Sequence, residues 1–152
     1  MKEEDKKKIR LKTANEDDKQ RVIQYHHAAY KEMVLRQFGK WDIQQQNKFV
    51  EDDWNEGNIE IIVMDGTDCG YVKTHSGGEA LHVIDIAIMP DFQRQGIGTN
   101  VIGILKERAK TMNTKLRMDA FLTNIEAQMF YERNGFKIIG TTDTHNLNEW
   151  CD

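Results

Sequence analysis

The first half of the chain places apolar residues at two spacings, one typical of strands and one typical of helices. Two helical stretches are separated by a break around Gly39. The first begins after the N-cap candidate Asn15, and the second runs from Asp42 to about Glu56. Short glycine turns join the later strands, which predicts an antiparallel meander. The strands are expected over residues 9–13, 59–64, 69–75 and 80–89.

The second half of the chain alternates between the two spacings. Apolar residues recur at helical spacing from Ile97 to Met112, and residues 124–133 suit another helix. Strand, helix and strand in this order favour a parallel crossover. Strands are expected over residues 116–122, 136–141 and 144–150. The whole pattern predicts an α+β domain with a mixed sheet.

Length and composition narrow the class of protein. The 152 residues suit a single domain over residues 9–152, after a solvated, charged tail at residues 1–8. A net charge of −4 argues against a nucleic-acid partner. No apolar run is long enough to span a membrane, and the start lacks the apolar centre of a secretory signal. The two cysteines form no spaced set, so we expect a cytoplasmic protein without a metal.

A glycine-bearing turn, MPDFQRQGIGTNV at residues 89–101, lies between a predicted strand and a predicted helix. Gly96 and Gly98 allow backbone N–H groups to approach a ligand. The helix start at Ile97 adds free donors and a partial positive charge, which suit a pyrophosphate, and Arg94 could add a full charge. The turn matches neither the GxxxxGK[ST] nor the GxGxxG pattern.

A second stretch, NIEAQMFYERNGF at residues 124–136, carries three residues of interest. Asn124, Ala127 and Tyr131 are spaced to share one face of a helix. That face offers an amide, a methyl-sized gap and a phenol. Asn134-Gly135 suits the end of this helix.

Together the two stretches resemble the GNAT superfamily of acetyl-CoA-dependent N-acetyltransferases, of the small bacterial type. The match begins at Pro90, continues through residues 93–98 as [QR]xxGxG, and includes Asn124, Ala127, Tyr131, Gly135 and Phe136. The resemblance implies a GNAT fold, with a mostly antiparallel mixed sheet of about seven strands and about four helices. It also implies a splay between the fourth and fifth strands.

The resemblance implies acetyl-CoA as cosubstrate. The backbone of residues 94–99 would hold the pyrophosphate, and the end of the fourth strand would pair with the pantetheine arm. Asn124 would bond that arm, Ala127 would leave it room, and Tyr131 would face the sulfur. The implied acetyl-CoA-binding residues are Ile86, Ala87, Ile88, Arg94, Gln95, Gly96, Ile97, Gly98, Thr99, Asn124, Ala127 and Tyr131.

Acetyl transfer requires a neutral amine, donors for the oxyanion and a partner for the leaving thiolate. An alkylammonium has a pKa near 10.4, so its deprotonation at pH 7 costs about 4.6 kcal/mol, and a base helps. Tyr131 is the candidate acid, acting through a hydrogen bond to the thiolate. Backbone N–H groups at residues 86–88 are candidate oxyanion donors.

The base is harder to assign. The resemblance implies an acidic residue or a histidine six positions before Pro90, where this chain has Ile84. Asp85 and His82 are the nearest titratable groups and the catalytic candidates. Strand alternation turns Asp85 away from Ile84 and His82 unless a bulge intervenes. A structural, hydrogen-bonded Asp85 is the alternative.

The acceptor is expected near the front helices, where aromatic faces and a carboxylate suit a cationic amine. The candidates are Tyr30, Trp41 and Asp42, with simple packing as the alternative. Cys69 could be the nucleophile of a covalent route, but a lone cysteine on a predicted strand is usually a core residue. The resemblance implies direct transfer of acetyl to a primary amine of a small molecule in a ternary complex, and it leaves a homodimer open. The alternatives are a protein or peptide N-acetyltransferase and a non-catalytic acyl-CoA-binding module.

Overall fold

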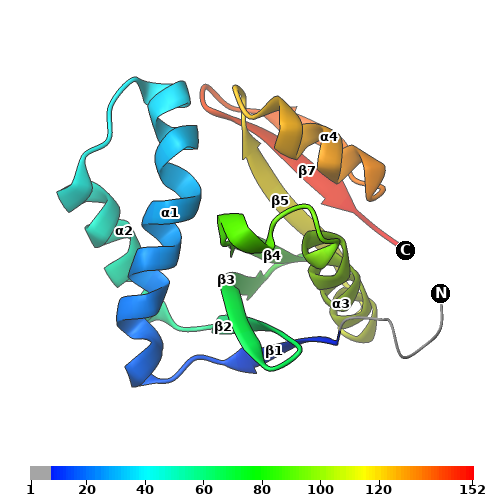
Figure 1. Ribbon diagram of the computed structural model, residues 1–152. Coiled ribbons are helices and arrows are strands. Elements are labelled where there is room, and N and C mark those ends of the chain that lie inside the picture. The colour runs from blue at the N-terminus through cyan, green and yellow to red at the C-terminus, as the bar shows by residue number, and fades with distance from the viewer. Residues whose placement is uncertain (1–7) are drawn as a thin grey trace.

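One seven-stranded sheet runs through the molecule, with α1 and α2 on one face and α3 and α4 on the other (Figure 1). The computed structural model describes residues 8–152, so the predicted tail, apart from Lys8, lies outside the described residues. The helices are α1 Lys19–Phe38, α2 Ile43–Glu56, α3 Ile97–Thr111 and α4 Ile125–Arg133. The strands are β1 Ile9–Thr13, β2 Ile59–Met64, β3 Thr67–Gly77, β4 Ala80–Ile88, β5 Lys115–Phe121, β6 Lys137–Thr141 and β7 His145–Trp150.

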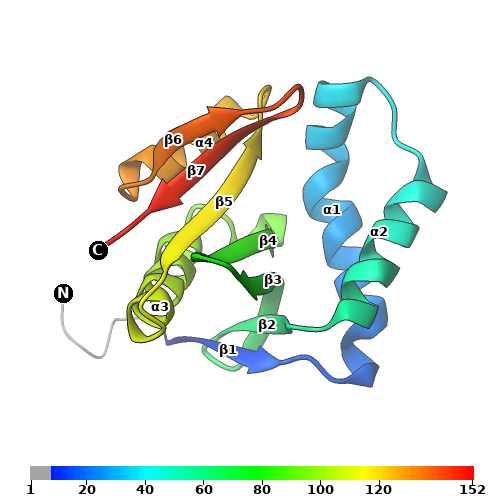
Figure 2. The ribbon, with the colours of Figure 1, turned by 180° about the vertical axis from the view of Figure 1, so that it is seen from behind.

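The order of the strands is β1-β2-β3-β4-β5-β7-β6, and every neighbouring pair except one is antiparallel. The exception is β4 with β5, which are parallel and pair only between residues 80–83 and 115–118. Beyond these residues the two strands diverge and divide the sheet into two halves (Figure 2). The predicted α+β class, mixed sheet and splay are therefore confirmed.

Two apolar clusters hold the layers together. Between the sheet and α3 and α4, residues such as Leu105 and Val101 of α3 pack on Leu81 and Val83 of β4. Between the sheet and α1 and α2, Val22 and Val50 pack on strand residues that include Ile61, Tyr71 and Ala87. Side chains of one strand thus divide between the clusters in alternation.

The alternation in β4 is interrupted once. Lys73 of β3 pairs with Asp85, whereas the next residue, Thr74, pairs with Val83, so Ile84 is the extra residue of a bulge. Leu81 and Val83 lie in the cluster under α3, and Ile86 and Ile88 pack against the same cluster. The bulge therefore turns Asp85 toward α1 and α2, on the same face as His82. A regular strand would have turned it toward α3.

In the described part of the chain, no helix has both the length and the apolar character needed to cross a bilayer.

Candidate active site

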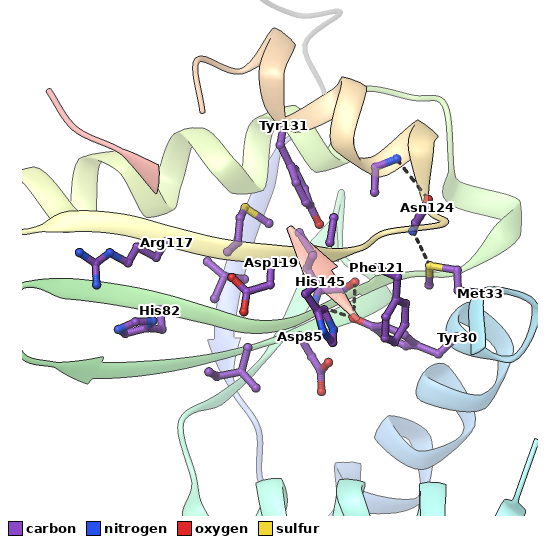
Figure 3. A pocket seen from close by; sticks show the side chains of 16 residues that line it. Tyr30, Met33, His82, Asp85, Arg117, Asp119, Phe121, Asn124, Tyr131 and His145 are labelled. Atoms are coloured by element: carbon purple, nitrogen blue, oxygen red, sulfur yellow. Dashed lines mark hydrogen bonds between the residues drawn. The ribbon is translucent and has the colours of Figure 1, made fainter. Parts of the chain in front are cut away.

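Two cavities meet at the splay between β4 and β5. The small cavity, of about 320 Å³, is lined by α1, the middle of β4, β5 and α4 (Figure 3). The large cavity, of about 750 Å³, is lined by α1, the end of β4, the loop after it and α4. They share five lining residues: Met33, Ile86, Asn124, Ala127 and Tyr131. The two cavities therefore adjoin at these residues.

The loop before α3 forms one wall of the large cavity. Gln93 Nε2 donates to the carbonyl of Ile88 at 2.8 Å and ties the loop to the end of β4. Arg94 and Gly96 have φ values of 62° and 80°, in the left-handed region, and α3 starts directly after Gly96. Its first turn exposes N–H groups that have no partner within a helix. Those donors, the positive helix end and the Arg94 side chain fit a pyrophosphate.

Packing against α4 leaves little room for a side chain at Gly98. A Cβ atom there would lie 3.1 Å from Cζ of Phe130 on α4. The absence of a side chain thus allows α3 and α4 to approach each other beside the large cavity. The distance between these two helices helps to set the width of the cavity.

The edge of β4 at the splay has hydrogen-bond partners. The hydroxyl of Tyr30 on α1 accepts from the N–H of Ile86 and donates to its carbonyl, both at 3.2 Å (Figure 3). We expect the backbone of residues 86–88 to meet the pantetheine arm or the oxyanion. In this structure the Tyr30 phenol contacts the backbone of Ile86, and the Gln93 side-chain amide contacts that of Ile88. A ligand that approaches the backbone of Ile86 therefore meets the Tyr30 hydroxyl there.

The helix α4 begins at the splay. Asn124 is its N-cap: its Oδ1 accepts from the N–H of Ala127 at 3.2 Å, and its Nδ2 lies 2.8 Å from the sulfur of Met33 on α1. Tyr131 points from α4 into the splay between the two cavities (Figure 3). Only 8% of Tyr131 is exposed. Burial, with Asp119 and Asp85 nearby, raises the pKa of this phenol well above its usual value, so it stays protonated.

Asp85 lines the small cavity from the α1 and α2 side. Its pKa is raised to about 8, mainly by burial and next by the nearby carboxyl of Asp53. His82 lies on the same face and lines the same cavity (Figure 3). Its ring is 6.4 Å from that of His75. The structure thus brings both catalytic candidates to one cavity, with Asp85 closer to Tyr30.

Three residues at this site had not been predicted. Asp53 of α2 faces Asp85, and Lys73 of β3, fully buried, lies opposite it in the sheet. Asp119 lines the small cavity from β5, just beyond the last residue that pairs with β4. A lysine within the apolar strand at residues 69–75 was the one available signal. Nothing in the spacing of Asp53 or Asp119 distinguishes them from surface acids.

Two of the acceptor candidates lie outside both cavities. Asp42 caps α2, accepting the N–H of Gln45 at 3.1 Å. The ring of Trp41 packs on His27 and His26, at centroid distances of 5.3 and 6.3 Å. Of the three acceptor candidates, Tyr30 is the one that lines either of these two cavities. Trp41 thus packs on histidine rings and Asp42 caps a helix, and their part in acceptor binding stays a prediction.

Cys69 is a core residue. Its sulfur is fully buried and donates to the carbonyl of Ile62 at 3.4 Å. Burial raises the pKa of the thiol to about 11, so little thiolate exists near neutral pH.

The arrangement combines the parts of a two-substrate group transfer. The large cavity presents anion-binding donors at its outer end, and the small cavity holds a carboxyl with a raised pKa. A phenol stands where the cavities meet. The phenol, the carboxyl and the loop before α3 lie on different elements, and the splay of the sheet brings them together.

Comparison with known proteins gives the family. A family model for the acetyltransferase (GNAT) domain matches residues 55–138, more than half of the chain. No curated protein sequence matches.

Solved structures share the fold at low sequence identity. The PaiA N-acetyltransferase from Thermoplasma acidophilum, solved with coenzyme A, is 14% identical over 93% of this chain and 98% of its own, with a TM-score of 0.75. PH1933 from Pyrococcus horikoshii OT3 is 15% identical over 97% and 99% of the two chains, with a TM-score of 0.76.

The ribosomal-protein-S18-alanine N-acetyltransferase from Escherichia coli is 18% identical over 93% of this chain and 90% of its own, with a TM-score of 0.66. The fold with its splay, the paired motifs and the family model agree, and the chain belongs to the GNAT acetyltransferase family.

Proposed function

We propose that the protein transfers the acetyl group of acetyl-CoA to a primary amine of a small molecule by direct attack in a ternary complex. The observation that carries this proposal is that two adjoining cavities share Tyr131 in their lining. Acetyl-CoA would lie in the large cavity with its thioester at the shared wall. The amine would approach from the small cavity.

The large cavity supports acetyl-CoA as the donor. Its loop offers the donors for a pyrophosphate, through the backbone of residues 94–99. Ile86, Ala87 and Ile88 lead from that loop toward the shared wall along β4. The arm of the cosubstrate would displace the Tyr30 hydroxyl from the backbone of Ile86, or bond beside it. Asn124 and Ala127 border the same path from α4.

In the proposed reaction the neutral amine nitrogen attacks the thioester carbon. A C–N bond forms, and the oxyanion then collapses with cleavage of the C–S bond. The thiolate of coenzyme A leaves with a hydrogen bond from Tyr131. The amine proton passes to Asp85, directly or through water, with His82 as the second candidate. Because burial weakens Tyr131 as an acid, its role is donation of a hydrogen bond rather than full proton transfer.

The raised pKa of Asp85 suits a base for an amine. Proton transfer from an alkylammonium of pKa near 10.4 to an ordinary aspartate of pKa near 3.9 is uphill by about 9 kcal/mol. A carboxyl with a pKa of about 8 reduces this to roughly 3 kcal/mol. That difference lies within reach of an enzymatic reaction at moderate rate.

The size of the small cavity favours a small acceptor. Its volume of about 320 Å³ is at the lower end for ligand pockets. The acceptor side chain or ring would contact Tyr30, while the amine nitrogen lies toward Asp85 and Tyr131.

The test is a screen of amines, amino acids and short peptides with acetyl-CoA. Free coenzyme A would be followed by a thiol reagent, and the acetylated product identified by mass spectrometry. We expect turnover with small primary amines. Turnover with peptides alone would assign the protein N-acetyltransferase alternative. Tight binding of acetyl-CoA with no turnover across the screen would favour the non-catalytic acyl-CoA-binding module.

A further inference from the structure

Lys73 holds the last turn of α2 over the middle of the sheet. Its ammonium donates to the backbone carbonyls of Asp53, at 3.2 Å, and of Gly57, and it lies 3.6 Å from Oε1 of Glu56. Lys73 is also the residue of β3 that pairs with Asp85. The clamp therefore fixes α2 directly above Asp85, and the carboxyls of Asp53 and Asp85 lie in hydrogen-bond contact.

Two carboxyls in one hydrogen bond must share a proton. Only a protonated carboxyl donates, so one proton lies between the two groups, and loss of that proton places two like charges in contact. The groups that face Asp85 are Tyr30 from α1, Asp53 from α2, Tyr71 and Lys73 from β3, and Tyr131 from α4. Asp53 is faced in addition by His26 from α1, by Lys73 and by Glu56 of its own helix.

Lys73 is the one cation in the set that faces Asp85. Its ammonium already contacts two backbone carbonyls and Glu56, so it compensates a second negative charge only in part. Tyr30 donates to the carbonyl of Ile86, which limits what it can give to Asp85. The pair therefore keeps its proton strongly.

We infer that Asp53 is a positioning residue for acetyl transfer, which shares one proton with Asp85 and thereby sets the pH range in which Asp85 accepts the proton of the amine. This inference rests on the proposed function, because it concerns the base of that reaction. Once the pair has lost its shared proton, Asp85 takes up the amine proton readily, since that proton removes the contact between like charges. Asp53 does not touch the amine.

The test in activity is Asp53→Asn, which keeps the size and the hydrogen bond and removes the charge. We expect the midpoint of the rising limb of the kcat–pH profile to move down by about one unit or more. The plateau value of kcat should fall, because the remaining carboxylate is a weaker base. A structural defect alone would lower kcat without moving the midpoint.

Asp52→Asn is the matched control. Asp52 is the neighbouring residue on α2, but it is exposed and pairs with Lys48 at 3.1 Å. The control should leave the midpoint unchanged. The inference would be overturned if the rising limb of Asp53→Asn had the same midpoint pH as the limbs of the parent and the control.

A measurement without substrate separates this inference from the proposed function. The carboxyl carbons of Asp53 and Asp85 would be followed by NMR through a pH titration of the parent protein. A shared proton makes both signals respond to the same two pH steps. In Asp53→Asn, the Asp85 signal should titrate in one step at lower pH. Independent single-step titrations of both carboxyls in the parent would overturn the inference, whether or not any amine is acetylated.

Discussion

At Tyr131, the burial of the side chain agrees with the role in the proposed mechanism. The side chain is 8% exposed, it stands between the two cavities, and its raised pKa makes it a poor proton donor but a constant hydrogen-bond donor. A group that meets charge only as the thiolate develops lowers the barrier without tightening the ground state.

Tyr131→Phe keeps the ring and its packing on Phe136 and removes the hydroxyl. We expect kcat to fall by roughly 10²-fold. The affinity for coenzyme A should change by less than about threefold, because the lost contact belongs to the transition state. Steady-state kinetics with a confirmed acceptor and calorimetric titration with coenzyme A measure the two effects.

Tyr25→Phe is the control, since Tyr25 packs at the edge of the cluster under α1 and α2, outside both cavities. It should have the kcat of the parent. A Tyr131→Phe enzyme as fast as the parent would show that another group or water serves the thiolate. Loss of coenzyme A binding would make Tyr131 a binding residue instead.

Asp85 also links the stability of the fold to pH. Its pKa is raised from an unfolded value near 3.9 to about 8, and burial raises that of Asp53 as well. The folded protein therefore binds more protons than the unfolded chain between these values. The stability from these carboxyls is complete below about pH 4 and is lost as the pH rises through about 8.

We expect Asp85→Asn to remove much of this dependence. Its Tm relative to the parent should increase from pH 5 to about pH 8 and level off by pH 9, at roughly 2–4 °C for each kcal/mol. Differential scanning calorimetry of both proteins across this range measures the trend. Parallel curves would mean that Asp85 has no raised pKa in the folded protein.

At the scale of elements, the loop before α3 owes its shape to residues with left-handed backbone angles. Gly96 has a φ of 80°, and a Cβ atom added there would meet only the side chain of Asn100, at 4.0 Å. A larger side chain would thus project without a protein contact to oppose it. It would enter the space that we assign to the pyrophosphate.

Gly96→Trp should weaken coenzyme A binding by about tenfold or more, which corresponds to roughly 1.4 kcal/mol. Gly39→Trp is matched in backbone strain: its φ is 75°, it has no neighbour within 4 Å, and it ends α1 outside both cavities. Both variants should lose stability of about 1–2 kcal/mol from the left-handed angle. Calorimetric titration of the two folded variants separates strain from occlusion, and equal affinities would refute the assignment of the loop.

Most elements could be predicted because their apolar spacing is regular. The strand at residues 59–64 and the helix from Ile97 are examples in which sequence and structure agree closely. The position of β7 between β5 and β6 could not be predicted, because pairing order is set by long-range packing. The bulge at Ile84 has no composition that marks it, so the face of Asp85 stayed open.

The site divides in the same way. The positions of the loop at residues 94–99 and of Asn124, Ala127 and Tyr131 beside the cavities could be predicted, because short motifs carry them, whereas their roles stay predictions. Asp53 could not be, since it reaches Asp85 only through the packing of α2 on the sheet, 32 residues away along the chain (85 − 53). Trp41 and Asp42 have the chemistry of a cation site, but the start of α2 uses them for packing and capping.

At the scale of the whole molecule, α1 joins the two halves of the divided sheet. Tyr30 bonds to Ile86 of β4, and Gln37 accepts from the N–H and the hydroxyl of Thr123, which follows β5, at 3.1 and 2.7 Å. Phe38 packs edge-on against Phe121 at 5.6 Å. The helix thus forms a shared wall, and both cavities open beside it.

This architecture predicts sequential kinetics. Two substrates that meet at one wall react directly, and neither Cys69 nor Cys151 lines either cavity. Initial rates measured against acetyl-CoA concentration, at several fixed amine concentrations, should give intersecting lines in double-reciprocal plots. Incubation with radiolabelled acetyl-CoA alone should leave no label on the protein. Parallel lines together with a labelled protein would establish an acetyl-enzyme and exclude direct attack.

The extra residue in β4 governs how positions can be carried from one relative to another by alignment. Counting back from Pro90 assigns the correct face as far as Asp85, and every earlier position is then offset by one. An alignment without a gap at Ile84 therefore places Leu81 and Val83 in columns that belong to the opposite face. A relative with an uninterrupted strand would need a one-residue gap there, and only then would its residues before the gap fall in columns of their own face.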